Sequence, residues 1–356
     1  MTLDLSSLNA NQLEAVQWQN GPLLVLAGPG SGKTRVLTYR IARILNETPD
    51  KYFRILGLTF TNKAAAEMRE RIEELVPNAR ERTHLTTVHS FSADLLRQHG
   101  HHINLRPDFT ILVQDADREG LLDEVIAELR QTEEEINYTG ESLLPVITRL
   151  LDDTIAPENA ASFLAKHGTD NAEIIGALYS AYRQKMKAKN SLDFGGLIAE
   201  ALALLEQKPA VKRQIHRIYP CFCVDEFQDT NLAQYKVLCH LVNQTTKNLF
   251  VVADDDQIIY QWNGASPERL ETLRKDFDMA VLQLPENYRC PPEVIDLANK
   301  LIVHNLGRSA DKETLRAYKQ RGVSSPVKLN YFVTFDEEAA WIADDISQRP
   351  RGEWGK

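Results

Sequence analysis

Residues 25–37 read VLAGPGSGKTRVL, a glycine-rich turn between two apolar stretches. The preceding residues, PLLVLA at 22–27, form a short apolar run that is typical of a buried parallel strand. The following residues, 33–45, place their apolar side chains at helical spacing. The turn is therefore predicted to join a strand to a helix, and the fold class is predicted to be α/β with a parallel sheet.

The glycines and the lysine of this turn predict a phosphate-binding loop. Glycine lets the backbone turn tightly and approach a ligand, and the N–H groups at a helix N-terminus attract anions. Lys33 would reach the terminal phosphates, and the Thr34 hydroxyl would bind Mg²⁺. The strict pattern has glycine where this chain has Ala27, but the core G-x-G-K-T is intact. The alternative is a plain strand–turn–helix with a chance lysine.

Two further apolar runs end in carboxylates. CFCVDEFQDTN at 221–231 places Asp225 and Glu226 after its apolar part, and LFVVADDDQIIYQW at 249–262 leads into an acidic cluster and Gln257. An aspartate at a strand end can hold Mg²⁺, and the next carboxylate can polarise the water that attacks a γ-phosphate. Because ligands bind at the carboxyl ends of parallel strands, we expect these groups to converge on Lys33. For the DDD cluster alone, a solvated turn is the alternative.

A set of motifs identifies a family resemblance. LNANQLEAV, AGPGSGKTRVL, LTFTNKAAAEMRERI, TVHSF, LDF, VDEFQDTN, VVADDDQIIYQW and ENYR follow one another along the chain. In this order they resemble the N-terminal half of superfamily 1 DNA helicases of the UvrD/Rep/PcrA group, from about Leu8 to at least Ile302. The resemblance implies a RecA-like P-loop NTPase domain, ATP and Mg²⁺ as cofactors, single-stranded DNA as partner, and movement from 3′ to 5′. The pathway that it implies is DNA repair, replication restart, recombination or defence.

The resemblance also implies the roles of the ATP-site residues. Gln12 would read the adenine edge, and Arg35 and Tyr288 would sandwich the adenine ring. Gln257 would contact the γ-phosphate, and Arg289 would act as an arginine finger that stabilises charge on the transferred phosphoryl group. The remaining predicted ATP-site residues are Gly28, Gly30, Ser31, Gly32, Lys33 and Thr34, with Lys33, Asp225 and Glu226 as catalytic groups and Thr34 and Asp225 as metal ligands.

Other motif residues are predicted to contact single-stranded DNA. They are Phe60, Thr61, Asn62, His89, Phe194, Tyr260 and Trp262. Stacking of bases on aromatic rings tolerates any sequence, which suits a motor that moves along DNA. For Phe60, Phe194 and Trp262 the alternative is packing in the core. The family usually has arginine where this chain has Asn263, and this departure implies weaker coupling between ATP and DNA.

The pattern of apolar runs predicts three parts. Residues 1–107 and 191–276 read as the first RecA-like ATPase domain, residues 108–190 as an all-helical insertion, and residues 277–356 as the start of a second RecA-like domain. The insertion ends in a basic run, Arg183, Lys185, Lys187 and Lys189, which is either a solvated helix face or a phosphate-contacting patch.

The resemblance implies that the second domain continues beyond Lys356. The chain is then a fragment, a truncated gene product, or a subunit that a partner protein completes, and we expect it to unwind DNA weakly or not at all. A non-motor module that binds ATP or single-stranded DNA without turnover is the second hypothesis, which Asn263 favours. A P-loop small-molecule kinase is the third, and it leaves TFTNKAA and QIIYQW unexplained.

Composition restricts the partners and the compartment. The formal net charge of −9 opposes nucleic acid, so any DNA contact must use a local surface rather than the overall field. The four cysteines have poor zinc-ligand spacing and are predicted to be reduced thiols of a cytoplasmic protein. No apolar run reaches the roughly 18 residues of a membrane span, and the N-terminal residues do not resemble a signal peptide, so no membrane partner is expected.

Overall fold

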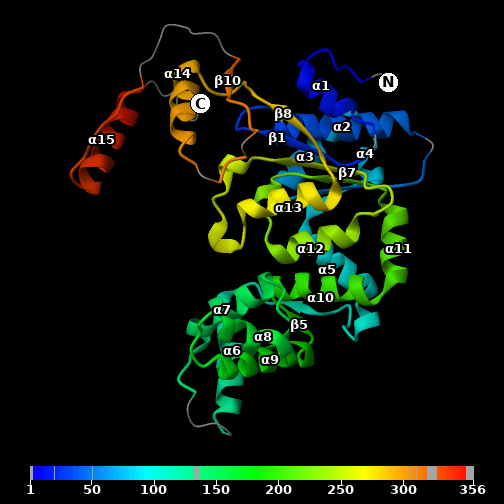
Figure 1. Ribbon diagram of the computed structural model, residues 1–356, viewed down its shortest axis with the longest axis vertical. Coiled ribbons are helices and arrows are strands. Elements are labelled where there is room, and N and C mark those ends of the chain that lie inside the picture. The colour runs from blue at the N-terminus through cyan, green and yellow to red at the C-terminus, as the bar shows by residue number, and fades with distance from the viewer. Residues whose placement is uncertain are drawn as a thin grey trace.

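The structure is a computed structural model that describes residues 3–19, 21–49, 51–131, 136–305, 307–309, 311–318 and 327–349 (Figure 1). In these residues a six-stranded sheet has the strand order β3-β2-β6-β7-β1-β8, and every neighbouring pair is parallel. The strands are β1 (Leu23–Ala27), β2 (Ile55–Thr59), β3 (Thr83–Thr87), β6 (Cys221–Val224), β7 (Leu249–Ala253) and β8 (Ala280–Leu284). The predicted α/β class with a parallel sheet is confirmed.

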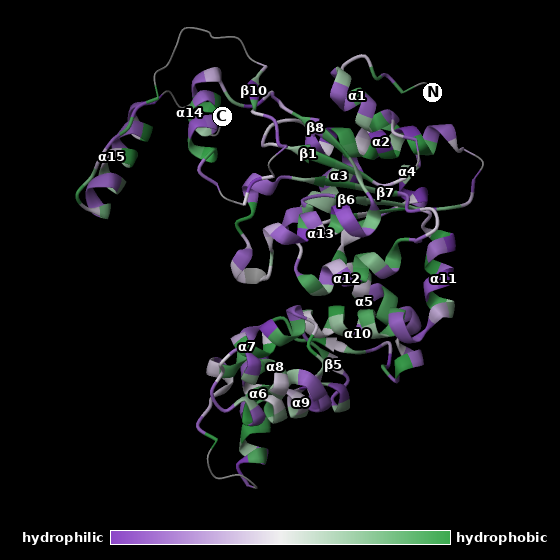
Figure 2. Ribbon diagram, viewed as in Figure 1, coloured by the Kyte–Doolittle hydropathy of each residue, from purple (hydrophilic) through white to green (hydrophobic). Residues whose placement is uncertain are grey.

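Helices cover both faces of this sheet, which explains why its strands read as continuous apolar runs. Within β1, Leu24 and Leu26 pack into one core and Leu23 and Val25 into the other; Figure 2 shows the apolar strands between the helical layers. The second core also contains residues of α1 (Ala10–Gln17), α2 (Lys33–Glu47), α3 (Asn62–Leu75) and α4 (Ala79–Arg82). The first contains residues of α5 (Val88–His99), α10 (Phe194–Gln207), α11 (Pro209–Ile218), α12 (Leu232–Leu241) and α13 (Pro267–Phe277).

A separate group of helices projects from one side of this layered core (Figure 1). The group lies between two short paired strands, and its elements are β4 (Thr110–Ile111), α6 (Asp115–Leu129), α7 (Gly140–Asp152), α8 (Ala160–Lys166), α9 (Ala172–Ala188) and β5 (Ser191–Leu192). The helices share a core of their own around Ile147, Tyr179 and Tyr182. The group meets the layered core at Asn231, whose Nδ2 donates to Asp152 Oδ1 over 2.7 Å. Its status as an insertion bounded at 108 and 190 stays a prediction.

The basic run at the end of α9 is largely neutralised by carboxylates. Arg183 Nη2 lies 2.6 Å from Glu200 Oε1. Lys185 Nζ lies 2.6 Å from Glu128 Oε1, and Lys189 Nζ lies 2.9 Å from Glu124 Oε2. These ion pairs favour the solvated, salt-bridged face over the phosphate-contacting patch.

The residues after β8 run back toward the glycine-rich loop and then away from the core. They form β9 (Glu286–Asn287), α14 (Pro292–Ile302), β10 (Arg316–Ala317) and α15 (Phe335–Gln348), and β9 pairs with β10. None of the described residues of α15 is buried, and Figure 1 shows this helix standing apart.

The position of β8 differs from the sequence prediction. We expected residues after 276 to begin a second domain, but β8 pairs with β1 along the central sheet, from Leu23↔Ala280 to Ala27↔Leu284. Strand β7 pairs with one edge of β1, and the other edge can accept a further parallel strand. The apolar run at 280–284 therefore does not decide by itself whether it joins this sheet or begins the sheet of a second domain. The second domain of residues 277–356 stays a prediction, and residues 306, 310, 319–326 and 350–356 of this range lie outside the described residues. No helix in the described parts of the chain is long and apolar enough to cross a membrane.

Candidate nucleotide and nucleic-acid site

The glycine-rich loop between β1 and α2 has the backbone conformation that only glycine adopts readily. Gly30 has φ 72° and Gly32 has φ 89°. A Cβ on Gly30 would lie 2.6 Å from Arg289 Cβ, and one on Gly32 would lie 2.8 Å from Gln12 Nε2. Helix α2 begins at Lys33, directly after Gly32. A turn of positive-φ glycines followed by a helix N-terminus forms a concave set of N–H donors suited to phosphate.

Hydrogen bonds within the loop and from distant parts of the chain hold the loop in this shape. Gln12 is buried, and its Nε2 donates to the Ser31 carbonyl over 2.9 Å. The Ser31 hydroxyl donates to the Gly28 carbonyl over 2.7 Å. The Tyr288 backbone N–H donates to the Gly30 carbonyl over 2.9 Å. Gln12 and Ser31 therefore fix the loop itself, while the adenine contact of Gln12 stays a prediction.

A cleft of about 390 Å³ opens beside this loop, and we call it the nucleotide cleft. Its walls combine residues that are far apart in the sequence: Pro29, Gly30, Gly32, Lys33, Thr34, Arg35, Arg71, Glu226, Gln257, Tyr288 and Arg289. Most of the predicted ATP-site residues thus meet here. Arg71 of α3 was missed, although it lies in the motif LTFTNKAAAEMRERI, because a helical arginine followed by Glu73 and Glu74 reads as a solvated charge.

Two of the three residues that are predicted to contact adenine, Arg35 and Tyr288, line this cleft. The Tyr288 hydroxyl accepts a hydrogen bond from Asn9 Nδ2 over 2.7 Å, and its ring lies 4.5 Å from the Tyr318 ring. The Arg35 guanidinium donates to the Ser7 hydroxyl over 2.6 Å. Both side chains are thereby held at the mouth of the cleft, and their sandwich around a base stays a prediction.

The carboxylates at the end of β6 give the nucleotide cleft its electrostatic character. Lys33 Nζ lies 3.1 Å from Glu226 Oε2, so the lysine already contacts an anion. Asp225 is only 6% exposed, and burial together with the Glu226 carboxylate raises its pKa to about 7. A buried carboxyl with this pKa favours a nearby cation, which would restore its charged form. The oxygens of Asp225 and Thr34 are ligands of the type that Mg²⁺ prefers, so these residues fit the predicted metal.

The acidic turn after β7 lies on the other side of Lys33. Asp254 is fully buried and Asp255 is 4% exposed, so the turn is not the solvated one of the alternative reading. Asp254 Oδ2 lies 4.0 Å from Lys33 Nζ. The Gln257 backbone N–H donates to the Asp254 carbonyl over 3.1 Å, and this bond fixes the start of the segment that carries Gln257 into the nucleotide cleft.

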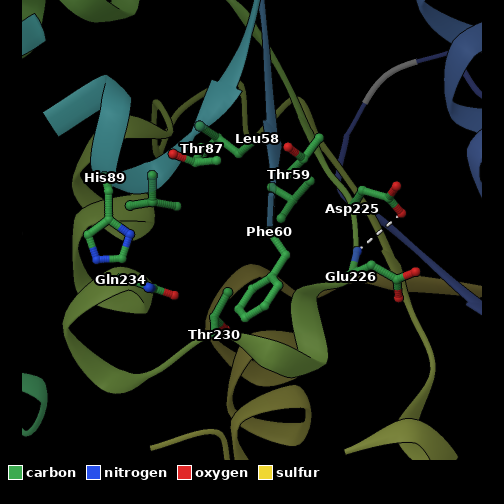
Figure 3. A pocket seen from close by; sticks show the side chains of 11 residues that line it. Leu58, Thr59, Phe60, Thr87, His89, Asp225, Glu226, Thr230 and Gln234 are labelled. Carbon is green, nitrogen blue, oxygen red and sulfur yellow. Dashed lines mark hydrogen bonds between the residues drawn. The ribbon is translucent and has the colours of Figure 1, made fainter. Parts of the chain in front are cut away.

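A second, smaller pocket of about 130 Å³ lies next to these carboxylates (Figure 3). Parallel strands β2 and β6 end at the same edge, with Leu58 opposite Val224, so Thr59 and Phe60 follow on one strand where Asp225 and Glu226 follow on the other. Figure 3 shows His89 on one side of the pocket, Asp225 and Glu226 on the other, and the Phe60 ring between them. The predicted catalytic carboxylates therefore line the same pocket as two predicted DNA-contacting residues.

The aromatic residues and the histidine that are predicted to contact DNA lie next to this pocket in two groups of rings, and we call the two groups together the aromatic face: Phe60, Tyr260 and Trp262 in one, His89 and Phe194 in the other. The Phe60 ring lies 4.9 Å from the Tyr260 ring, which lies 6.0 Å from the Trp262 ring. His89 and Phe194 meet edge to face at 5.5 Å, and burial lowers the pKa of His89. Trp262 is 79% exposed and Phe194 is 41% exposed, so core packing is excluded for both.

The polar residues of the same predicted contact lie at the start of α3. The Thr61 hydroxyl oxygen accepts from the Ala64 backbone N–H over 3.1 Å and caps the helix. Asn62 Oδ1 accepts from the Ser90 hydroxyl over 3.4 Å, which ties α3 to α5. Both residues are exposed beside Phe60, and their contacts with DNA stay a prediction.

Comparison with known proteins identifies the family. The model of the UvrD/REP helicase N-terminal domain matches residues 8–278. The ATP-dependent DNA helicase PcrA of Leuconostoc citreum is 37% identical over 347 residues, which is 96% of this chain and 45% of that protein. The PcrA helicases of Staphylococcus aureus strain Mu50 and Staphylococcus epidermidis are 33% and 32% identical over 355 residues, which is 98% of this chain and 46% of each of them.

This chain therefore spans about half the length of the curated relatives that it matches. The match covers the glycine-rich loop, the carboxylates after β6 and β7, and the aromatic face, all of which lie between residues 8 and 278. On these grounds the chain belongs to the UvrD/REP helicase family.

Proposed function

We propose that this chain carries the ATP-hydrolysing lobe of a DNA helicase, with the triphosphate of ATP held in the nucleotide cleft. The observation that carries the proposal is the position of Lys33, which contacts Glu226 at 3.1 Å in a cleft that also contains Gln257. The relatives are named ATP-dependent DNA helicases, which supports the same activity.

In this proposal each group in the nucleotide cleft has a separate task. The N–H groups of the glycine-rich loop and the Lys33 ammonium bind the phosphates, so Lys33 exchanges the Glu226 carboxylate for a phosphate oxygen. Glu226, released from that ion pair, accepts the proton of the attacking water. Arg289 stabilises negative charge on the transferred phosphoryl group. Thr34 and Asp225 hold Mg²⁺, which neutralises phosphate charge when it is bound.

We further propose that a single DNA strand binds across the aromatic face and that the motor moves from 3′ to 5′, the direction that the family resemblance implies. The exposure of Trp262 and Phe194 supports a stacking surface. The net charge of −9 supports stacking over a broad electrostatic attraction to the DNA backbone. The pocket between Phe60 and Asp225 offers a direct route by which events at the phosphates reach the bound strand.

The experiment is a measurement of ATP hydrolysis by the chain with and without single-stranded DNA. We expect DNA to stimulate the wild-type rate and Lys33→Ala to lower it by at least about 100-fold, because the lysine is the main cation at the phosphates. Lys166→Ala, at an exposed lysine of α8, is the matched control and should retain the wild-type rate. Equal rates in the wild type and Lys33→Ala would contradict the proposal.

A further inference from the structure

A lysine from the segment between α14 and β10 is inserted into the acidic turn after β7. Lys312 Nζ lies 2.6 Å from Asp254 Oδ1, 2.5 Å from Asp255 Oδ1 and 2.7 Å from Asp256 Oδ2. The lysine side chain is 4% exposed, so these contacts are shielded from water. Burial alone would lower the pKa of Lys312, but the carboxylates of Asp254 and Asp255 outweigh it and raise the pKa. The Lys312 ammonium thus forms ion pairs with three carboxylates.

Neighbouring residues of the same segment also bind the acidic turn. The Ser309 backbone N–H donates to Asp255 Oδ2 over 2.7 Å, and Arg308 Nη1 lies 3.5 Å from Asp256 Oδ2. Three residues further along the chain from Lys312, the Leu315 side chain packs against the glycine-rich loop, where its Cδ2 lies 2.5 Å from the point that a Cβ on Gly28 would occupy. The segment therefore covers both the acidic turn and the loop, and Lys312 is its central charge.

Asp254 connects this lysine to the nucleotide cleft. Its Oδ1 faces Lys312 Nζ at 2.6 Å, and its Oδ2 faces Lys33 Nζ at 4.0 Å. Lys33 therefore lies between Glu226 on one side and the acidic turn on the other. Breaking a buried ion pair leaves an uncompensated charge, which acts strongly on the nearest opposite charge. Without Lys312, that nearest charge at Asp254 would be Lys33.

Resting on the ATP site proposed above, we infer that Lys312 is a positioning residue for nucleotide binding. By neutralising Asp254, Asp255 and Asp256 it leaves Lys33 available to the phosphates, and it removes negative charge that would repel a triphosphate. Lys312 is outside the nucleotide cleft and acts through these carboxylates and Lys33. The site of ATP binding in this family member then depends on a residue beyond the 8–278 match.

The test is the affinity of the full chain for methylanthraniloyl-labelled ATP with Mg²⁺, together with kcat and KM for ATP hydrolysis. We expect Lys312→Met to raise Kd and KM by about tenfold while kcat changes by less than about threefold. Lys312→Arg keeps the charge and should stay within about threefold of the wild type. The control Lys300→Met, at an exposed lysine of α14, should bind as the wild type does.

A charge-compensated variant separates electrostatics from packing. In Lys312→Met/Asp254→Asn the turn keeps two carboxylates and no ammonium, which is the wild-type net charge of three carboxylates and one ammonium, and it loses the carboxylate that faces Lys33. We expect this variant to bind labelled ATP within about threefold of the wild type. If Lys312→Met alone does not fold, the double variant still tests whether Lys312 acts through its charge. Weak binding of labelled ATP by the folded double variant would overturn the inference.

The outcomes distinguish the two proposals. A wild-type chain that does not bind labelled ATP overturns the proposed function, and the role of Lys312 with it. A wild-type chain that binds, with Lys312→Met folded and within twofold of its affinity, overturns the role of Lys312 alone. A loss that Lys312→Arg and the double variant both fail to restore would assign Lys312 a packing role and also overturn the inference.

Discussion

The nucleotide cleft and the aromatic face are built from the same strand ends but hold their side chains in opposite ways. In the nucleotide cleft the Lys33 side chain is 10% exposed and pairs with Glu226, and the buried Gln12 donates to the Ser31 carbonyl of the loop. On the aromatic face Trp262 is 79% exposed and Phe194 is 41% exposed. A buried, paired site presents a fixed geometry to one kind of ligand, whereas exposed rings accept any base that stacks on them.

This difference teaches that the two sites should respond differently to substitution. Loss of a charge in the nucleotide cleft disturbs the network of Lys33, Glu226 and Asp254. Water cannot fully compensate the charge that loses its partner there, because the Lys33 and Asp254 side chains are shielded from solvent. Loss of a ring on the aromatic face removes one contact and leaves the others in place. Changes in the nucleotide cleft should therefore alter chemistry steeply, and changes on the aromatic face should alter affinity moderately.

The largest effect is expected for Glu226→Gln. The amide cannot accept the proton of the attacking water, so hydrolysis should fall by about 10²- to 10⁴-fold. Binding of labelled ATP should persist or tighten, because Lys33 loses the carboxylate that now lies 3.1 Å away. Single-turnover hydrolysis and equilibrium binding measure the two effects, with the exposed Glu141→Gln of α7 as control. A rate within tenfold of the wild type would show that Glu226 is not the base.

The next effect concerns the base of the aromatic face, where Asp152 and Asn231 pack under Gly264, two residues after Trp262. Burial, and less strongly the Asp153 carboxylate, raises the pKa of Asp152 from 3.8 to about 7. Between those pH values the folded protein retains a proton that the unfolded chain has lost. The free energy of unfolding therefore falls as the pH rises toward 7, and this loss is complete above that pH.

Asp152→Asn removes this titration and keeps an oxygen that accepts from Asn231 Nδ2. Relative to the wild type, its free energy of unfolding should rise by up to about 3 kcal/mol between pH 5 and pH 8. Urea unfolding at the two pH values measures the change, and Asp170→Asn, at an exposed residue before α9, is the control. An identical pH dependence in Asp152→Asn and the wild type would contradict the shifted pKa.

The aromatic face itself is tested by Trp262→Ala. Loss of one stacked base should weaken binding of single-stranded DNA by about 1–3 kcal/mol, while Kd for labelled ATP without DNA stays unchanged. Fluorescence anisotropy with a labelled oligonucleotide at one fixed salt concentration measures the affinity. Trp341→Ala, at a tryptophan of α15 that is 44% exposed, is the control for loss of an exposed ring. Equal loss in both variants would remove the special role of Trp262.

Sequence alone could predict the parts of the molecule that local chemistry determines. The glycines that adopt positive φ, the strand that precedes them and the helix that begins at Lys33 are all read from one short stretch. The convergence of Glu226 and Gln257 on Lys33 follows from a general property of parallel sheets, in which strand ends share one edge.

The contacts that sequence could not predict join segments with no local signal. Lys312 lies in a polar stretch, and only the return of the chain from β9 to β10 carries it to the acidic turn. The pairing of β8 with β1 is decided by which sheet edge is open rather than by the residues of the strand. Arg71 faces the nucleotide cleft because of the way α3 packs on the sheet.

The smallest effect is expected at the basic run of α9. This prediction tests whether surface charge adds to the DNA binding that we assign to the aromatic face. If exposed rings rather than surface charge bind the DNA strand, Lys185→Ala should change its affinity by less than about twofold, because Lys185 already pairs with Glu124 and Glu128. The same anisotropy titration measures it, at the salt concentration used for Trp262→Ala. A tenfold loss would mean that the strand displaces these carboxylates and that the helical group around α9 forms part of the DNA-binding surface. The aromatic face would then share its task with a charged one, and affinity would fall steeply with salt, whereas stacking alone predicts a shallow dependence.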